Sequence, residues 1–129
     1  MVEGFWLTIK VVTVKPSFKD KRGVIINILE EPINSAVMIT CEKGAVRANH
    51  YHKEDSHWSY MIIGKMEYYE KRPDGKLEKS IVKAGQMVYS APGVPHAMKF
   101  LEPSIFLALT TRKRLGGKYD EDTIKSRII

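Results

Sequence analysis

Short segments in which apolar and polar residues alternate dominate the chain, and they predict β-strands. Alternation places every second side chain on one face of a strand, so that one face is buried while the other meets water. The segments are rich in β-branched and aromatic residues, which strands favour. They lie at residues 24–30, 35–42, 45–52, 58–64, 65–71, 80–85, 86–91, 96–101 and 104–110.

Residues typical of turns separate these segments at nearly regular intervals. Glycine and proline stand between them, as in Pro73-Asp74-Gly75 and Pro92-Gly93. Many short strands punctuated in this way predict an all-β sandwich or barrel. No long amphipathic helical pattern competes with this interpretation. The final residues, 118–129, suit either a short helix after Gly117 or an added edge strand, and the pattern leaves both open.

Length and composition favour one globular domain over residues 1–129, because a chain of 129 residues that is 43% hydrophobic can bury a core without disulfides. The single cysteine, Cys41, cannot form an intramolecular disulfide. The opening MVEGFWLTIK lacks the basic start and apolar core of an export signal, and no apolar run approaches the roughly 18 residues that cross a bilayer. We therefore expect a soluble, cytoplasmic protein without a membrane partner.

The charge of the chain favours anionic partners. A net charge of +6 and a pI near 9.4 suit phosphates, sugar nucleotides or nucleic acid without choosing among them. The densest basic cluster, Arg112 to Arg114, is short and is soon followed by the acidic residues 120–122. No helix-turn-helix, zinc knuckle or aromatic-basic platform accompanies it. We expect a small anionic ligand and no nucleic acid.

The four histidines are the candidate functional residues. His50 and His52 are two apart in a predicted strand, so their side chains leave the same face. His57 opens the next strand after a short loop, which brings it opposite the residues before that loop. His96 joins them only if its strand lies beside these two in a closed barrel, which periodicity does not decide. A shared metal ion would bind one nitrogen of each buried imidazole, and a further acceptor would satisfy the other.

Two motifs around these histidines resemble those of the cupin superfamily. The first runs from Gly44 through His50-Tyr-His52 and His57 to Gly64, with His57 where the family usually has glutamate. The second has Gly85, then Ala91-Pro92-Gly93, His96 and Phe100 in register, with Ala91 where proline is usual and Phe100 where asparagine is usual.

The resemblance covers roughly residues 18–112 and leaves 113–129 as a tail. It implies a double-stranded β-helix, the jelly-roll-like cupin barrel, with one divalent transition metal ion inside. The resemblance assigns as ligands His50, His52, His57 and His96. Zinc, manganese, iron, nickel and copper all remain open as the metal. Glu54 and Asp55 have the character of loop residues and are less favoured as ligands.

A finer resemblance links DKRGVIINILE and VRANHYHK to the cupins that act on sugar nucleotides. It implies an epimerase or isomerase of a nucleotide-linked keto sugar in the synthesis of polysaccharide precursors. Arg47 is then the substrate-binding residue that contacts phosphate, since a guanidinium binds phosphate through two parallel hydrogen bonds. On a regular strand Arg47 faces away from His50 and His52, so only a bulge or a rim position would bring it to the site. A surface salt bridge is the alternative.

Four neutral imidazoles would leave a bound ion much of its Lewis acidity, which suits proton transfer next to a keto group or oxygen chemistry. A tetrahedral zinc ion with four histidines would be purely structural. If all four bind metal, the catalytic base must be a tyrosine or a carboxylate such as Glu67. The tyrosines considered are Tyr51, Tyr60, Tyr68 and Tyr89. We favour Tyr89, on the strand that enters the second motif, although it also suits the barrel wall.

Three functions therefore follow from the sequence. The first is a metal-dependent epimerase or isomerase, the second a dioxygenase-like cupin, and the third a cupin that binds a metal or small ligand without catalysis. Small cupins commonly pair through edge strands, and the apolar opening segment FWLTIKVV is a suitable partner surface. We therefore expect a homodimer.

Overall fold

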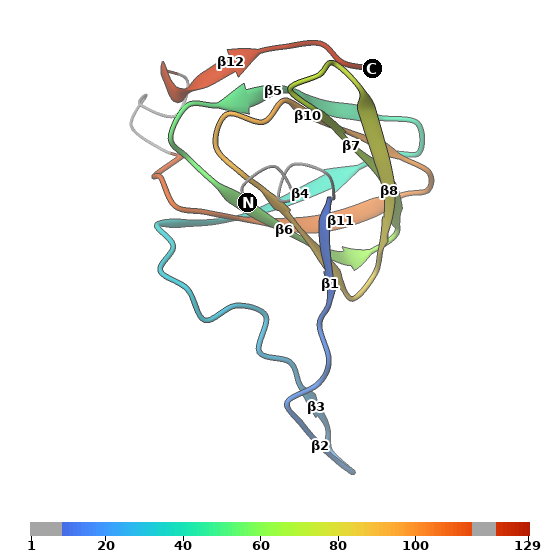
Figure 1. Ribbon diagram of the computed structural model, residues 1–129. Helices are drawn as coiled ribbons and strands as arrows, with labels where there is room; N and C mark the ends of the chain where they lie inside the picture. Colours follow the sequence, from blue (N-terminus) through green and yellow to red (C-terminus); the bar gives the residue numbers. More distant parts are fainter. Residues whose placement is uncertain (1–8, 115–120) are drawn as a thin grey trace.

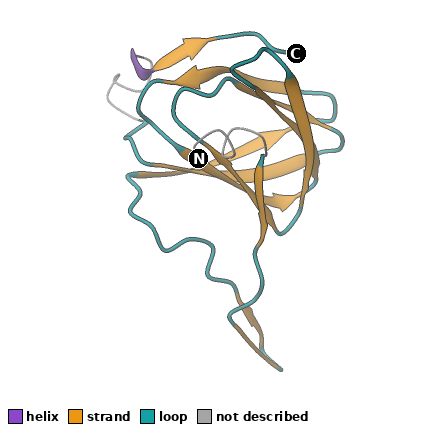
Figure 2. Ribbon diagram, viewed as in Figure 1, coloured by secondary structure: helices purple, strands orange, loops and turns teal. Residues whose placement is uncertain are grey.

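The computed structural model describes residues 9–114 and 121–129, which are nearly all β (Figures 1 and 2). Their strands form two antiparallel five-stranded sheets and one hairpin. The first sheet has the order β1 (Lys10–Thr13), β9 (Gln86–Ser90), β6 (His57–Ile63), β11 (Ser104–Thr110), β4 (Ser35–Cys41). The second has the order β12 (Thr123–Lys125), β5 (Val46–His52), β10 (His96–Phe100), β7 (Lys65–Lys71), β8 (Leu77–Lys83). The hairpin pairs β2 (Phe18–Asp20) with β3 (Gly23–Ile25).

The chain passes back and forth between the two sheets. Strands β4 to β7 lie alternately in the first and the second sheet. Strands β8 to β11 alternate in the same way, beginning in the second sheet. Two sheets wound in this way enclose a barrel (Figure 1). The predicted all-β double-stranded β-helix is confirmed.

Most predicted strands are confirmed within a few residues, but the strand predicted at 24–30 is wrong. Only Gly23–Ile25 forms a strand there, and it pairs with β2 outside the two sheets. Ile28 and Leu29 instead pack as irregular chain against the outer face of the first sheet. Their apolar side chains pack against the sheet although their backbone pairs with no strand. The apolar pattern of the sequence does not distinguish this arrangement from a strand.

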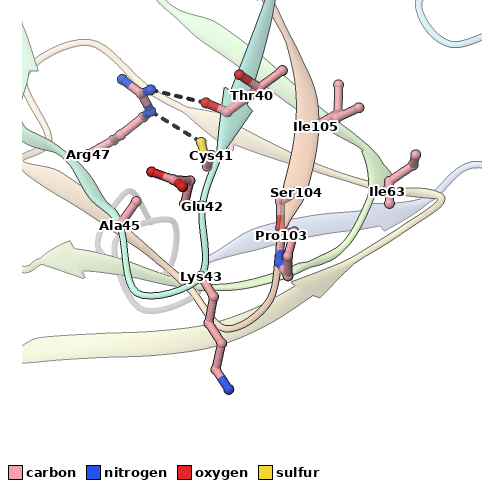
Figure 3. Close-up of a pocket in the computed structure, with 10 residues that line it drawn as sticks. All are labelled: Thr40, Cys41, Glu42, Lys43, Ala45, Arg47, Ile63, Pro103, Ser104 and Ile105. Carbon is pink, nitrogen blue, oxygen red and sulfur yellow. Dashed lines mark hydrogen bonds between the residues drawn. The ribbon is translucent and has the colours of Figure 1, made fainter.

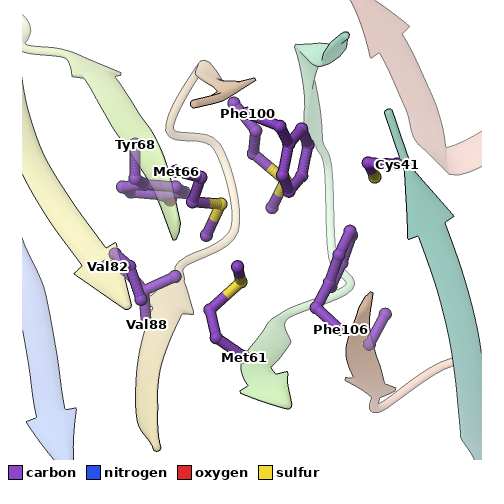
Figure 4. Close-up of a cluster of buried hydrophobic side chains, with 10 residues drawn as sticks. Cys41, Met61, Met66, Tyr68, Val82, Val88, Phe100 and Phe106 are labelled. Atoms are coloured by element: carbon purple, nitrogen blue, oxygen red, sulfur yellow. The ribbon is translucent and has the colours of Figure 1, made fainter. Parts of the chain in front are cut away.

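The main hydrophobic core fills the barrel between the sheets (Figure 4). Met61, Met66, Tyr68, Val82, Val88 and Phe100 are all completely buried there. A second cluster of Trp58, Tyr60, Met87 and Leu109 covers the outer face of the first sheet. Strands β6 and β11 thus contribute to apolar packing on both of their faces.

The C-terminal residues take the edge-strand alternative. Strand β12 pairs with β5, with Thr123 opposite His52 and Lys125 opposite His50. Glu121 and Asp122 are helical just before it (Figure 2), while the rest of the predicted short helix after Gly117 lies outside the described residues. Within the described ranges, no helix is long and apolar enough to cross a membrane.

Gly64 ends the first motif at a point where a side chain cannot be accommodated. Its φ is +99°, and an added Cβ would lie 2.8 Å from the Pro103 carbonyl oxygen and clash with the Ser104 side chain. We expect Gly64→Ala to lower the free energy of unfolding by about 3 kcal/mol through strain and overpacking together. Gly75→Ala is the matched control, because Gly75 has a φ of +88° and open space around it. Equal losses in urea denaturation of the two variants would contradict the packing argument.

Candidate metal centre and chamber

The barrel fold brings the four histidine rings together. His50 and His52 leave the same face of β5, and His96 at the start of β10 is the strand partner of His50. The ring centroids of His50 and His96 are 4.9 Å apart, and those of His52 and His57 are 4.3 Å apart. The condition that His96 must lie beside the first-motif strands is met. The rings form one cluster inside the barrel.

The possible ligand atoms fall into two overlapping groups. One group contains His50, His52 and His96, and the other contains His52, Asp55 and His57; within each group the atoms lie within 4.8 Å of one another. The roles of the four histidines as ligands remain predictions. His57 differs from the other three because it belongs only to the group that contains a carboxylate.

Burial keeps three of these imidazoles neutral. It lowers the pKa of His50 and of His52 to about 4, with the neighbouring His57 adding to the effect. Burial also lowers the pKa of His96 to about 3. Neutral imidazole is the form that ligates metals.

Asp55 is a buried partner of His57 that the sequence did not reveal. Its carboxylate lies 2.7 Å from His57 Nε2 and is completely buried. It also accepts hydrogen bonds from the Thr111 backbone N–H (3.1 Å), the Thr111 hydroxyl (2.8 Å) and the Arg112 N–H (3.0 Å). Burial alone would raise the pKa of Asp55, but the bonds from His57 and Thr111 outweigh it and lower that pKa to about 2. The carboxylate is therefore ionised.

A small chamber adjoins the histidines. Its volume is about 130 Å³. Its polar lining consists of Arg47, His50, His57, Ser59, His96 and Arg114, and its apolar lining of Ile39, Ala48, Met98, Phe106 and Ala108. Two guanidinium groups and three imidazoles make the chamber suitable for an anionic or oxygen-rich ligand. Sequence reasoning missed Arg114, which lies beyond the last barrel strand in a cluster that looked like ordinary surface charge.

A bulge in β5 brings Arg47 to the chamber. His50 pairs with His96, but the next pair is Ala48 with Ala97, so Asn49 is an extra residue. Ala48 and Asn49 have φ values of 69° and 54°, in the left-handed region. An extra residue reverses the alternation beyond it, so Arg47 points to the same side as His50. The sequence required a bulge or a rim position to bring Arg47 to the site, and the structure contains the bulge. Phosphate binding by Arg47 remains a prediction.

Arg47 also borders an outer cleft of about 900 Å³ (Figure 3). Its Nε donates a hydrogen bond to Cys41 Sγ (3.1 Å), and its Nη2 donates one to the Thr40 carbonyl oxygen (3.1 Å). The guanidinium thus reaches from β5 to β4, across the side where the two sheets are not hydrogen-bonded. It lines both the cleft and the chamber.

Tyr89, the tyrosine that the sequence favours as catalytic base, lies on the face of β9 opposite to the histidine cluster. Tyr89 pairs with Trp58 across β9 and β6, whereas its neighbour Ser90 pairs with His57. Adjacent residues of a strand face opposite ways, so Tyr89 lies on the outer face of the sheet. There it packs against Trp58 and beneath the ammonium group of Lys10. This position agrees with the alternative role, an aromatic of the barrel wall, and the catalytic role of Tyr89 stays a prediction.

Tyr68 lies beside the histidines. Its ring is nearly parallel to that of His96, at 6.0 Å between centroids. Its hydroxyl donates to Glu70 Oε2 (3.0 Å) and lies 2.7 Å from Ser90 Oγ. Burial, and next the charge of Glu70, raise the pKa of Tyr68 well above its usual value, so the phenol stays protonated. Met66, Tyr68 and Glu70 alternate along β7 and face inward. This alternation is the sequence signal that could have favoured Tyr68 over Tyr89.

A double-stranded β-helix that gathers histidines from two strand motifs inside its barrel defines the cupin class. The family model described as Cupin matches residues 26–113, and the chain belongs to this family. Among curated proteins, none matches the sequence.

Solved structures of sugar-nucleotide enzymes are similar to this chain. WlaRB, a TDP-quinovose 3,4-ketoisomerase from Campylobacter jejuni, has a TM-score of 0.76 and 19% identity over 93% of this chain and 94% of its own. QdtA, a sugar 3,4-ketoisomerase from Thermoanaerobacterium thermosaccharolyticum in complex with TDP, has a TM-score of 0.72 and 22% identity over 93% and 89%. A dTDP-4-dehydrorhamnose 3,5-epimerase from Sulfolobus tokodaii has a TM-score of 0.69 and 22% identity over 86% and 74%. These likenesses show a shared fold.

The donor set fits a transition metal, which the cupin family implies. The ligand atoms of His50, His52 and His96 lie within 4.8 Å of one another, close enough to share one ion. Neutral imidazole nitrogens suit zinc, iron, copper and nickel. These three residues could therefore hold an ion in the barrel.

The same histidines should make the metal-free protein sensitive to acid. Their native pKa values are about 4, 4 and 3, whereas histidine in an unfolded chain titrates near 6.5. Below about pH 6.5 the unfolded chain binds protons that the native state does not, so stability present above that pH is lost as the pH falls toward 4. We expect the urea midpoint of chelator-treated protein to fall between pH 7 and pH 4.5. A constant midpoint would contradict the burial of neutral imidazoles.

Proposed function

We propose that this cupin is an isomerase or epimerase of nucleotide-linked keto sugars, with a divalent transition metal ion held by His50, His52 and His96. The observation that carries the proposal is the chamber in which guanidinium and imidazole groups meet. The functions of the similar structures support it, since they are 3,4-ketoisomerases and a 3,5-epimerase of TDP-linked sugars.

The size of the chamber suits the sugar and not the whole nucleotide. A cavity of about 150 Å³ is known to hold a benzene-sized ligand, so a chamber of about 130 Å³ takes no more than a single six-membered ring. The nucleotide would then remain outside, and the outer cleft of about 900 Å³ has the room for it. Arg47 lines both spaces and is the candidate contact for the phosphate groups between ring and nucleoside.

In epimerisation a proton leaves the carbon next to the keto group and returns to its other face. In isomerisation the proton returns to the former keto carbon, and the neighbouring hydroxyl proton moves to the former keto oxygen. When bound, the metal ion would supply Lewis acidity that stabilises the developing oxyanion. His57 lines the chamber, and Asp55 holds its Nε2. In this proposal His57 accepts the proton through its Nδ1, the ionised Asp55 stabilises the resulting imidazolium, and His57 then returns the proton.

Proton exchange tests the proposal directly. TDP-4-keto-6-deoxyglucose is incubated with the metal-loaded protein in D2O, and NMR follows the carbons next to the keto group. Isomerisation or epimerisation with deuterium incorporation is expected. Tight binding without incorporation would instead indicate a ligand-binding cupin, and oxygen consumption with substrate loss would indicate a dioxygenase.

A homodimer is part of the proposal. The β2–β3 hairpin projects from the barrel (Figure 1), and Phe18, Val24 and Ile25 on it are 51%, 48% and 61% exposed. Two strands alone form no core, so an apolar hairpin of this kind gains stability from a second surface. We expect light scattering at micromolar concentration to give twice the chain mass and Ile25→Asp to shift it toward the monomer. A monomeric wild-type protein would contradict the dimer.

A further inference from the structure

Residues 122–129 run along the outside of the first-motif strand, and we call them the strap. Strand β12 in the strap pairs with β5, and Ser126 N–H donates to the Asn49 carbonyl oxygen (2.9 Å). Figure 1 shows β12 lying along β5 at the edge of the second sheet. The strap therefore covers the strand that carries Arg47, His50 and His52.

Thr123 of the strap contacts a candidate ligand. Its Oγ1 lies 3.1 Å from Nδ1 of His52, which is 1% exposed. When the Nδ1–H of His52 donates to this hydroxyl, Nε2 is the nitrogen without a proton, as metal binding requires. With the hydroxyl as acceptor, the contact holds His52 in the tautomer that presents Nε2 to a metal.

Asp122 of the strap fixes the loop between β5 and β6. Its Oδ1 and Oδ2 accept the backbone N–H groups of Glu54 and Asp55, both at 3.0 Å, and its carbonyl oxygen accepts the N–H of Lys53 (2.9 Å). Asp122 is 6% exposed. Since Asp55 holds His57, the strap also sets the position of that pair.

Asn49 ties the far end of the strap to the bulge. Its Oδ1 accepts the N–H groups of Ile128 (2.9 Å) and Ile129 (3.1 Å). Asn49 is the extra residue of the bulge and has a φ of 54°. These bonds hold the bulge that turns Arg47 toward the chamber.

We infer that the strap is a positioning element of the site, which sets the tautomer of His52 through Thr123, the Asp55–His57 pair through Asp122, and the direction of Arg47 through Asn49. These contacts come from one short segment and reach three different parts of the site. The measurements of Co²⁺ and TDP affinity that test this inference rest on the proposed function. The measurement of the His52 tautomer does not.

The test of Thr123 uses Thr123→Val, which removes the hydroxyl and keeps the side-chain shape. We expect the ring-nitrogen NMR signals of His52 in metal-free protein to change from one tautomer to a mixture. We also expect the affinity for Co²⁺, followed by its absorption, to fall about 10–100-fold. Thr123→Ser should restore both. Thr13→Val, on exposed β1, is the matched control and should change neither.

The test of Asn49 uses Asn49→Gly, since glycine keeps the left-handed backbone and removes only the side-chain bonds to the strap. We expect affinity for TDP to fall about tenfold, because Arg47 loses its fixed direction. Affinity for Co²⁺ should stay within about threefold of wild type, whereas Thr123→Val should leave TDP binding unchanged. Circular dichroism checks that each variant is folded.

The two failures are distinguishable. Wild-type protein that binds neither Co²⁺ nor TDP would overturn the proposed function, and the His52 tautomer would still decide the role of Thr123. A single His52 tautomer in Thr123→Val, with wild-type affinities for Co²⁺ and TDP in both variants, would overturn the positioning role of the strap.

Discussion

Asp55→Ala is expected to lower the free energy of unfolding by about 3–5 kcal/mol at pH 7. The substitution removes the acceptor of the Arg112 N–H and of the Thr111 hydroxyl, while the Thr111 N–H keeps the Ser56 carbonyl oxygen (3.2 Å). Removing one partner of the buried Asp55–His57 pair costs about 3–5 kcal/mol, and the lost hydrogen bonds of Thr111 and Arg112 contribute to this loss. Urea denaturation with the metal-free protein measures the loss.

Asp74→Ala is the matched control for Asp55→Ala. Asp74 also accepts a backbone N–H, that of Lys76 at 2.9 Å, but does so at the surface. Its substitution should cost less than about 1 kcal/mol, because water replaces the lost bond. A loss below about 1 kcal/mol for Asp55→Ala would show that the buried carboxylate is not the anchor of this loop.

His57→Gln is expected to lower kcat for keto-sugar isomerisation by about 10²–10⁴-fold, the range for loss of a positioned acid–base group. Glutamine retains polarity and similar size but cannot carry the proton. In the proposed division of roles, His50, His52 and His96 hold the ion, so the Co²⁺ affinity of the variant should stay within about threefold of wild type.

The same variant tests the ligand role that the family resemblance gives to His57. If His57 is a fourth ligand, His57→Gln loses metal together with activity. His57→Glu, which places the usual cupin residue at this position, would then restore metal binding. Activity lost while metal is retained supports the proton-transfer role.

Most of the fold follows from the sequence because its strands are amphipathic or fully apolar and are separated by turn residues. The histidine cluster also follows, since motif spacing fixes which residues of neighbouring strands face each other. Residues 24–30 were mistaken for a strand because apolar packing of Ile28 and Leu29 on the sheet needs no strand pairing.

Parts of the site depend on long-range register and could not be predicted. Tyr89 faces outward because Ser90, and not Tyr89, pairs with His57. Asp55 resembles a loop residue until Thr111 and Arg112, more than 50 positions later, provide its hydrogen bonds. The direction of Arg47 depends on a bulge whose left-handed residues are Ala48, which gives no signal in the sequence, and Asn49, which gives a weaker one than glycine.

The chamber lies between a wall formed by β6 and a wall formed by β5. Because β6 packs against apolar side chains on both of its faces, the β6 wall resists local unfolding more strongly. His57 and Ser59 stand on β6, which is hydrogen-bonded on both sides by β9 and β11. Arg47 and His50 stand on β5, whose outer neighbour is only the three-residue strand β12. Local unfolding begins where few buried contacts oppose it. Amide hydrogen exchange should therefore be slowest in β6 and much faster in β12, so the wall that carries Arg47 and His50 yields before the wall that carries His57.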